Sequence, residues 1–190
     1  NKNLEIVAIN DLASIEANAH LFNFDSTHGK FNGIVKTNKN GFVINNKLIR
    51  VYSEKDPEKL PWGDLKIDVV LECTGFFASK EKSNKHLKAG AKKVIISAPA
   101  SNVDATIVQG VNNKILKKNH KIISNGSCTT NCLAPVAMIL NETVGIINGY
   151  MTTIHSFTGD QRTLDTIHSD LRRARTASES LIPTSTGAAK

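Results

Sequence analysis

The sequence predicts an α/β fold, in which a doubly wound parallel sheet is followed by part of a second domain with a different pattern. Short apolar runs at residues 4–9, 67–73 and 93–97 each end in a polar turn, as buried parallel strands do. Segments with helix-capping signals separate these runs, which gives the β-α-β alternation of a sheet with helices on both faces. The pattern changes after Gly126.

The predicted elements follow the chain in a regular order. A serine before the first helix and a glycine after the second are the caps expected at helix ends. Between the helices, Asn-Gly and Asn-Asn pairs punctuate an alternating stretch, which indicates hairpins. In order, we expect strand 4–9, a helix from Ser14 to about Phe24, hairpin strands within 33–51, strand 67–73, helix 79–89 ended by Gly90, strand 93–97, and short strands at 106–108 and 121–124.

Two domains are predicted, residues 1–126 and 127–190. In the second domain, residues 150–157 have a Thr-rich alternation typical of a long strand, and a polar, Arg-rich loop follows at 158–178. The first strand and G-x-G-x-x-G turn of a nucleotide-binding sheet do not occur in the sequence. We therefore expect the first domain to be incomplete at its start and the second at its end, and the 190 residues alone to be inactive and poorly folded.

Composition narrows the class of protein. The chain is 40% hydrophobic and 22% charged, which is ordinary for a globular protein. No stretch approaches the ~18 apolar residues of a membrane span, and three scattered cysteines suit a reducing, cytoplasmic setting. The net charge of +7 suits an anionic small substrate, whereas 5% aromatic content offers no base-stacking surface, so nucleic acid is not expected as a primary partner.

The sharpest local feature is a cysteine at a predicted helix start. Ser127 is the expected N-cap, so Cys128 falls in the first turn, where free N–H groups and the helix dipole favour a thiolate. The same N–H groups can hold an oxyanion. A buried structural cysteine is the alternative. Cys132, one turn later, is expected to lie deeper and to be inert, and no metal site is expected because no Cys/His pair completes one.

A reactive thiolate needs a base, and His155 is the candidate. It lies in the predicted strand 150–157 beside polar residues, whereas His20 and His86 fall in predicted helices and are expected on the surface. The alternative for His155 is a core histidine whose hydrogen bonds are satisfied.

Many blocks of the sequence together resemble the glyceraldehyde-3-phosphate dehydrogenases. The run from Ser124 to Pro135 is similar to their active-site signature, and the match is collinear over essentially the whole chain. The other blocks are Asn10 to Leu12, Asp25 to Gly29, Asp56-Pro57, Pro61 to Gly63, Glu72 to Phe77, Ser97 to Ala100, Met151 to His155, Asp170 to Arg175 and Pro183 to Lys190. The stretch from Leu171 to Arg175 is similar to bacterial members.

The resemblance implies a fold and an activity. The fold is a Rossmann-like NAD-binding domain (1–126) followed by part of an α+β catalytic domain (127–190). The implied activity is the glycolytic, NAD-dependent oxidative phosphorylation of D-glyceraldehyde 3-phosphate by inorganic phosphate to 1,3-bisphosphoglycerate. By motif match, Cys128 is the nucleophile that forms a hemithioacetal and then a thioester, and His155 is its base. Residues 158–178 match a segment that packs beside a neighbouring subunit, which implies a homotetramer.

The resemblance also implies two sets of binding residues. The positions matched to the two phosphate sites are Ser127, Thr129, Thr158, Arg173, Thr186 and Gly187. The positions matched to the NAD site are Asn10, Asp11, Lys55, Thr74, Gly75 and Ser97. Asp11 would bind the adenosine ribose and repel the extra phosphate of NADP, although Thr166-Ile167 departs from the pair common in NAD-dependent bacterial members.

Two other functions stay open. Erythrose-4-phosphate dehydrogenase shares the fold and the cysteine chemistry, but residues 158–161 and 184–190 are more similar to the glyceraldehyde enzyme. A non-catalytic binding protein built on the dinucleotide fold is compatible with the charge of +7, but an intact Cys128 and His155 argue against it.

Overall fold

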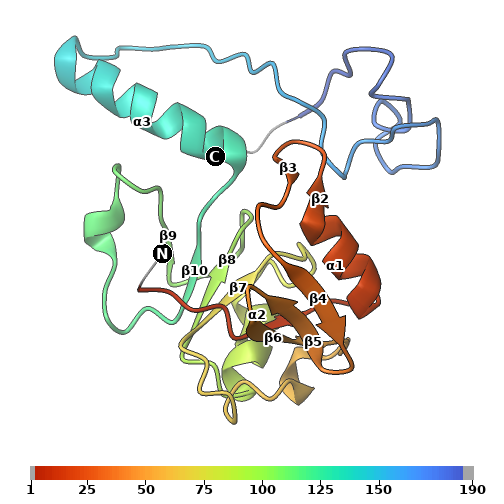
Figure 1. Cartoon of the computed structure of the whole chain (residues 1–190). Coiled ribbons are helices and arrows are strands. Elements are labelled where there is room, and N and C mark those ends of the chain that lie inside the picture. Colours follow the sequence, from red (N-terminus) through yellow and green to blue (C-terminus); the bar gives the residue numbers. More distant parts are fainter. Residues whose placement is uncertain (1–2, 186–190) are drawn as a thin grey trace. The chain divides into compact units, whose positions relative to one another are not determined.

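The computed structural model describes residues 3–185 and divides the chain into two compact units. The first unit is Asn1–Thr106 with Lys117–Ser124, and the second is Ile107–Leu116 with Asn125–Lys190 (Figure 1). The predicted Thr186 and Gly187 lie outside the described residues.

The first unit contains a mixed four-stranded sheet with the order β1-β6-β5-β4. β1 (Ala8–Asn10) pairs in parallel with β6 (Lys47–Tyr52), and β5 (Gly41–Ile44) pairs antiparallel with β6 and with β4 (Val35–Asn38). The hairpin between β5 and β6 turns on Asn45 and Asn46, whose φ angles of 48° and 68° are left-handed, as the predicted Asn-Asn signal requires. A short hairpin is formed by β2 (Phe24–Asp25) and β3 (Gly29–Lys30).

The second sheet of this unit is entirely parallel and has the order β7-β8-β10-β9. Its strands are β7 (Val69–Glu72), β8 (Lys93–Ile96), β9 (Ala105–Thr106) and β10 (Ile122–Ser124). Because the strands are parallel, their carboxyl ends meet at one edge, where ligands of such sheets bind. The predicted α/β class is therefore confirmed.

Two helices accompany these sheets. α1 (Ile15–Asn23) packs against β4 and β5, and α2 (Lys80–Lys88) packs against β8 and β10. Ser14 is the predicted N-cap of α1 and accepts from the Ala17 N–H. Ser79, where the second helix was predicted to begin, is the N-cap of α2 and accepts from the Lys82 N–H. A 3-10 turn, η1 (Pro57–Lys59), also packs against α2.

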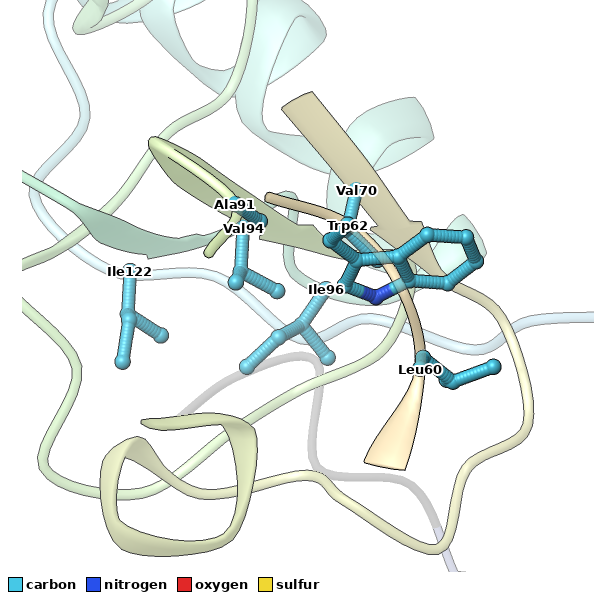
Figure 2. Close-up of a cluster of buried hydrophobic side chains, with 7 residues drawn as sticks. All are labelled: Leu60, Trp62, Val70, Ala91, Val94, Ile96 and Ile122. Atoms are coloured by element: carbon cyan, nitrogen blue, oxygen red, sulfur yellow. The ribbon is translucent and has the colours of Figure 1, made fainter. Parts of the chain in front are cut away.

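The core of the first unit lies around the parallel sheet. Its seven buried side chains are Leu60, Trp62, Val70, Ala91, Val94, Ile96 and Ile122 (Figure 2). Val94 and Ile96, on the central strand β8, are fully buried. Ala8 of β1 and Tyr52 of β6 pack against this cluster, so it contacts both sheets.

The second unit carries a long helix and little other regular structure. α3 (Cys128–Thr143) begins after Ser127, and a 3-10 turn, η2 (Asn113–Ile115), precedes it in the chain. The predicted strand at 150–157 was wrong: these residues form no strand. A strand exists only where a partner completes its hydrogen-bond ladder, and no described segment pairs with 150–157.

Among the described residues, no helix combines the length and the apolar character needed to cross a membrane.

Candidate active site

Cys128 is the first residue of α3, as the sequence predicted. The Ser127 hydroxyl oxygen accepts from the Thr130 N–H at 2.9 Å, which caps the helix and leaves Cys128 at its N-terminal end. Gly126 precedes the cap with a φ of 69°, a left-handed conformation that glycine adopts without strain. The amide of Asn131 donates to the carbonyls of Asn125 and Ser127 at 2.6 and 2.9 Å, which ties the turn to the helix.

His155 lies in contact with this cysteine although 27 residues separate them in the chain. The Cys128 Sγ and His155 Nε2 atoms are 3.2 Å apart. The other ring nitrogen, Nδ1, lies 2.7 Å from the backbone carbonyl oxygen of Ser156. A carbonyl can only accept, so Nδ1 carries a proton, and Nε2 of the neutral ring is free to take the thiol proton.

The two groups shift each other's proton affinity. The hydrogen bond with His155 is the main cause that lowers the pKa of Cys128. Burial acts in the opposite direction, and hydrogen bonds from the backbone and side chain of Thr129 lower the pKa further. The Ser156 carbonyl raises the pKa of His155, and the Cys128 sulfur raises it further. These opposite shifts favour a thiolate–imidazolium pair, which is the nucleophilic form of a cysteine.

Cys128 is exposed, which removes the alternative of a buried structural cysteine. The expected deeper position of Cys132 was wrong, because this cysteine is exposed as well. The burial of a helix face depends on what packs against it, and no residue of α3 is buried within the described part of the chain. Cys128 differs from Cys132 by its place in the first turn and by its contact with His155.

The residues matched to the phosphate sites occupy two places in this unit. Ser127 and Thr129 flank Cys128 at the start of α3. Thr158 lies in a turn, where its N–H donates to the side-chain oxygen of Gln161 at 2.9 Å. This turn lines an open hollow of about 370 Å³ together with Phe157, Gly159, Arg162 and Thr163.

Arg173 is held by its own neighbours. Its guanidinium forms an ion pair with Asp160 and donates from Nε to the Thr184 hydroxyl at 2.7 Å. His168 Nε2 lies 3.5 Å from the other oxygen of Asp160. Among residues 3–185, no hydrogen bond joins Arg173 or Thr158 to Cys128, whereas the predicted nucleophile and base are in direct contact.

One part of the predicted NAD site lies where β1 and β6 end. Asn10 exchanges two hydrogen bonds with the backbone of Glu54, at 3.0 and 2.9 Å, and so fixes the segment that contains Lys55. Asp11 Oδ1 accepts from the Ala13 N–H at 2.8 Å and from the Asn18 amide at 3.3 Å. Asp11 therefore helps to start α1.

The other part lies at the carboxyl ends of β7 and β8. Thr74 and Gly75 follow β7, Ser97 follows β8, and all three are exposed. The Ser97 N–H donates to the Glu72 carbonyl at 3.0 Å, which closes the end of the sheet. Gly75 has a φ of 76° and nothing near the position of a Cβ, so its backbone is open to a ligand. An acidic residue and exposed strand-end turns fit a dinucleotide.

No group of three or more His, Cys, Asp or Glu side chains is gathered for a metal ion anywhere in the described residues.

Fold and site together define a class of protein: a nucleotide-binding α/β protein with an activated cysteine paired to a histidine at a helix N-terminus. Comparison with known families identifies the family. Residues 1–80 match the model described as "Glyceraldehyde 3-phosphate dehydrogenase, NAD binding domain", and residues 127–190 match the C-terminal domain of the same family. The chain belongs to the glyceraldehyde-3-phosphate dehydrogenase family, and the matched NAD binding domain supports NAD as its cofactor.

Curated relatives extend this match along nearly the whole chain. The chain is 60% identical to glyceraldehyde-3-phosphate dehydrogenase of Clostridium acetobutylicum over 98% of its length, and 61% identical to that of Zymomonas mobilis over 98%. It is 57% identical to the enzyme of Geobacillus stearothermophilus over 100%. The aligned region covers 57%, 56% and 57% of these relatives, so the chain spans a little over half of their length.

Sequence reasoning missed a buried polar group in the first unit. His86 was expected on the surface, but it is 4% exposed and lies between Trp62 and Glu72. The expectation failed because the loop that carries Trp62 packs onto α2. Ser83, three residues before His86, is fully buried, so both residues lie on a buried face of α2. The placement of two polar, uncharged side chains one turn apart in a Lys-rich helix was the available signal.

Proposed function

We propose that the whole protein is a phosphorylating, NAD-dependent glyceraldehyde-3-phosphate dehydrogenase. The observation that carries this proposal is the 3.2 Å contact between Cys128 Sγ and His155 Nε2 at the N-terminal end of α3, in a chain of this family. A binding protein has no need for a thiol whose pKa is lowered by a paired histidine. The geometry therefore favours catalysis over the non-catalytic alternative.

The reaction begins with Cys128. Its thiolate attacks the aldehyde carbon of glyceraldehyde 3-phosphate, and the His155 imidazolium donates its Nε2 proton to the resulting oxyanion, which gives a hemithioacetal. N–H groups in the first turn of α3 stabilise the negative oxygen before it is protonated.

His155 acts in the opposite direction in the oxidation step. Neutral Nε2 takes the hemithioacetal hydroxyl proton as the hydride leaves the carbon, so that a thioester remains on Cys128. The chemistry that NAD supplies when bound is acceptance of that hydride. The residues that would hold the cofactor in this proposal are Asn10, Asp11, Lys55, Thr74, Gly75 and Ser97.

Inorganic phosphate then releases the product. A phosphate oxygen attacks the thioester carbonyl, the C–S bond breaks, and Cys128 leaves as the thiolate that His155 stabilises. Ser127, Thr129, Thr158 and Arg173, with Thr186 and Gly187, are proposed for the substrate phosphate and the attacking phosphate, because hydroxyls, N–H groups and a guanidinium suit phosphate oxygens.

We also propose a cytoplasmic homotetramer. The support is the match of residues 158–178 to a segment that contacts a neighbouring subunit in the family. Light scattering on the whole protein tests the assembly, and a mass of one or two subunits would contradict it.

The proposed reaction is tested by NADH formation in the whole protein. We expect NADH with glyceraldehyde 3-phosphate, NAD and phosphate, almost none beyond a single turnover without phosphate, and a lower kcat/KM with erythrose 4-phosphate. Cys128→Ser should abolish turnover, whereas Cys132→Ser is the matched control on the same helix and should retain it. A higher kcat/KM with erythrose 4-phosphate would identify the alternative enzyme, and no NADH with either aldehyde would contradict both.

A further inference from the structure

A continuous chain of hydrogen bonds runs through the core of the first unit and ends at an exposed turn. The Trp62 indole Nε1 lies 3.1 Å from His86 Nδ1, and His86 Nε2 lies 2.9 Å from Glu72 Oε2. Trp62, His86 and Glu72 are 5%, 4% and 3% exposed. The Trp62 ring belongs to the hydrophobic cluster shown in Figure 2, and the Phe77 ring packs edge-on against His86. We refer to these three polar groups as the Trp62–His86–Glu72 chain.

The Trp62 indole fixes which group donates and which accepts in each hydrogen bond of this chain. An indole N–H can only donate, so His86 Nδ1 must accept and carries no proton. The proton of the neutral ring then lies on Nε2, which donates to Glu72. A ring protonated on both nitrogens would turn an N–H toward the Trp62 N–H, which the 3.1 Å distance does not allow.

Glu72 connects the buried chain to Thr74. Its other oxygen, Oε1, accepts from the Thr74 N–H at 2.8 Å and from the Thr74 hydroxyl. Burial by itself would raise the pKa of Glu72, but the hydrogen bonds from His86 and Thr74 together outweigh burial and hold that pKa below its usual value. The carboxylate is therefore charged, and a buried charge is tolerated only with such donors.

These hydrogen bonds leave the exposed Thr74 hydroxyl oxygen able only to accept a further hydrogen bond. Its hydroxyl proton goes to Glu72, and one hydroxyl lone pair receives the Phe76 N–H at 3.1 Å. The second lone pair can only accept. Thr74, Gly75 and Phe76 are exposed at the carboxyl end of β7, and Gly75 has its left-handed φ of 76° there.

We propose that the Trp62–His86–Glu72 chain is a positioning device that locks Thr74 and Gly75 into the conformation that binds the cofactor, with the Thr74 oxygen as an acceptor for a cofactor hydroxyl. This inference rests on the proposed function, because it takes NAD as the ligand of this turn. His86, Trp62 and Glu72 act through Thr74 and touch no ligand in this proposal. Neither the family match nor the predicted site assigned them a role.

The test exploits the pattern of donors and acceptors at position 86. His86→Phe removes both hydrogen bonds and leaves Glu72 with a buried, under-satisfied charge. His86→Gln restores the pattern, because its amide oxygen can accept from Trp62 and its amide N–H can donate to Glu72. Calorimetric titration of the whole protein with NAD should show that His86→Phe weakens binding about tenfold, a cost typical of a charged hydrogen bond, and that His86→Gln recovers most of it.

A structural control separates positioning from loss of stability. Val70→Ala creates a cavity in the same core, on β7, without touching a hydrogen bond of the chain. Urea unfolding should show that Val70→Ala destabilises the protein about as much as His86→Phe does, while its Kd for NAD stays near that of the wild type.

The His86→Phe variant should raise the KM for NAD and leave the KM for glyceraldehyde 3-phosphate unchanged. Trp62→Phe removes one donor only and should weaken NAD binding less than His86→Phe does.

The outcomes are distinct. The inference is overturned if His86→Phe and Trp62→Phe bind NAD as the wild type does, or if Val70→Ala weakens NAD binding as much as His86→Phe. It is also overturned if His86→Gln folds stably but does not recover the affinity for NAD. If His86→Phe does not fold, the affinities of Trp62→Phe and His86→Gln for NAD still test the inference. Failure of the wild-type protein to bind NAD would instead contradict the proposed function.

Discussion

Cys128 Sγ and His155 Nε2 lie 3.2 Å apart, and the second ring nitrogen of His155 is held at 2.7 Å by the carbonyl of Ser156. The start of α3 positions the thiol of Cys128. The Ser156 carbonyl holds the proton of the neutral His155 ring on Nδ1, which leaves Nε2 free to act as the base. Neither residue needs a third side chain for this arrangement, because a backbone carbonyl orients the ring.

Replacing the base should slow catalysis without affecting the cofactor. His155→Asn removes the group that exchanges protons with the thiol and with the hemithioacetal, so kcat should fall about 10²–10⁴-fold. The Kd for NAD should not change. Steady-state kinetics and calorimetry measure the two quantities, and His20→Asn, at an exposed helix position, is the control that should behave as the wild type. A His155→Asn enzyme within about twofold of the wild-type kcat would show that this histidine is not the base.

The cofactor preference should depend on the charge of Asp11. Asp11→Asn keeps an oxygen for the Ala13 N–H and removes the charge that would repel the additional phosphate of NADP. The ratio of kcat/KM for NADP to that for NAD should rise about tenfold, which corresponds to about 1.4 kcal/mol.

Asn18→Ala is the matched control for this prediction, because it removes a different partner of the same oxygen. Its ratio of the two kcat/KM values should equal that of the wild type. An unchanged ratio in Asp11→Asn would mean that Asp11 serves only the start of α1.

Asp104 should make the first unit sensitive to acid. Its carboxylate accepts from the N–H groups of Lys121 and Ile122 at 2.7 and 3.0 Å and from Lys80 Nζ at 2.6 Å. The Ile122 and Lys80 hydrogen bonds lower its pKa far below the usual range. A depressed carboxyl pKa contributes stability above the unfolded value of about 3.9, and this contribution is lost as the pH falls below it.

Urea unfolding at neutral and acidic pH measures this contribution. Asp104→Asn should lower the free energy of unfolding by about 2 kcal/mol at neutral pH and by much less near pH 3. Asp64→Asn, at an exposed position, should change little at either pH. The prediction fails if Asp104→Asn costs the same free energy at both pH values.

Local signals predicted more of this structure than long-range ones did. Ser14 and Ser127 were identified as caps because the capping preference depends on the residue and the few that follow it. The same reasoning placed Cys128 in the first turn of its helix. The helix starts and most strands of the first unit were therefore predictable.

Features that depend on a distant partner were not predictable. Residues 150–157 have a strand-like sequence, but a strand requires a neighbour and none of the described segments provides one. His86 is buried because Gly63 and Gly90 let the loop and the end of α2 approach closely: a Cβ on Gly90 would lie 2.4 Å from Gly63 Cα. Patterns along the chain do not report such contacts. The contact of Cys128 with His155 was suggested by the family resemblance, and spacing alone could not establish it.

The activation of Cys128 by His155 is tested most directly by the pH dependence of thiol alkylation. The whole protein is treated with limiting iodoacetamide over a pH series, and the rates at Cys128 and Cys132 are read from their peptides by mass spectrometry. Because the pKa of Cys128 is lowered, its reactivity should persist below the free-thiol value of about 8.5, and His155→Asn should move its midpoint upward. Equal rates at Cys128 and Cys132 across the series, or a midpoint unchanged by His155→Asn, would contradict the account.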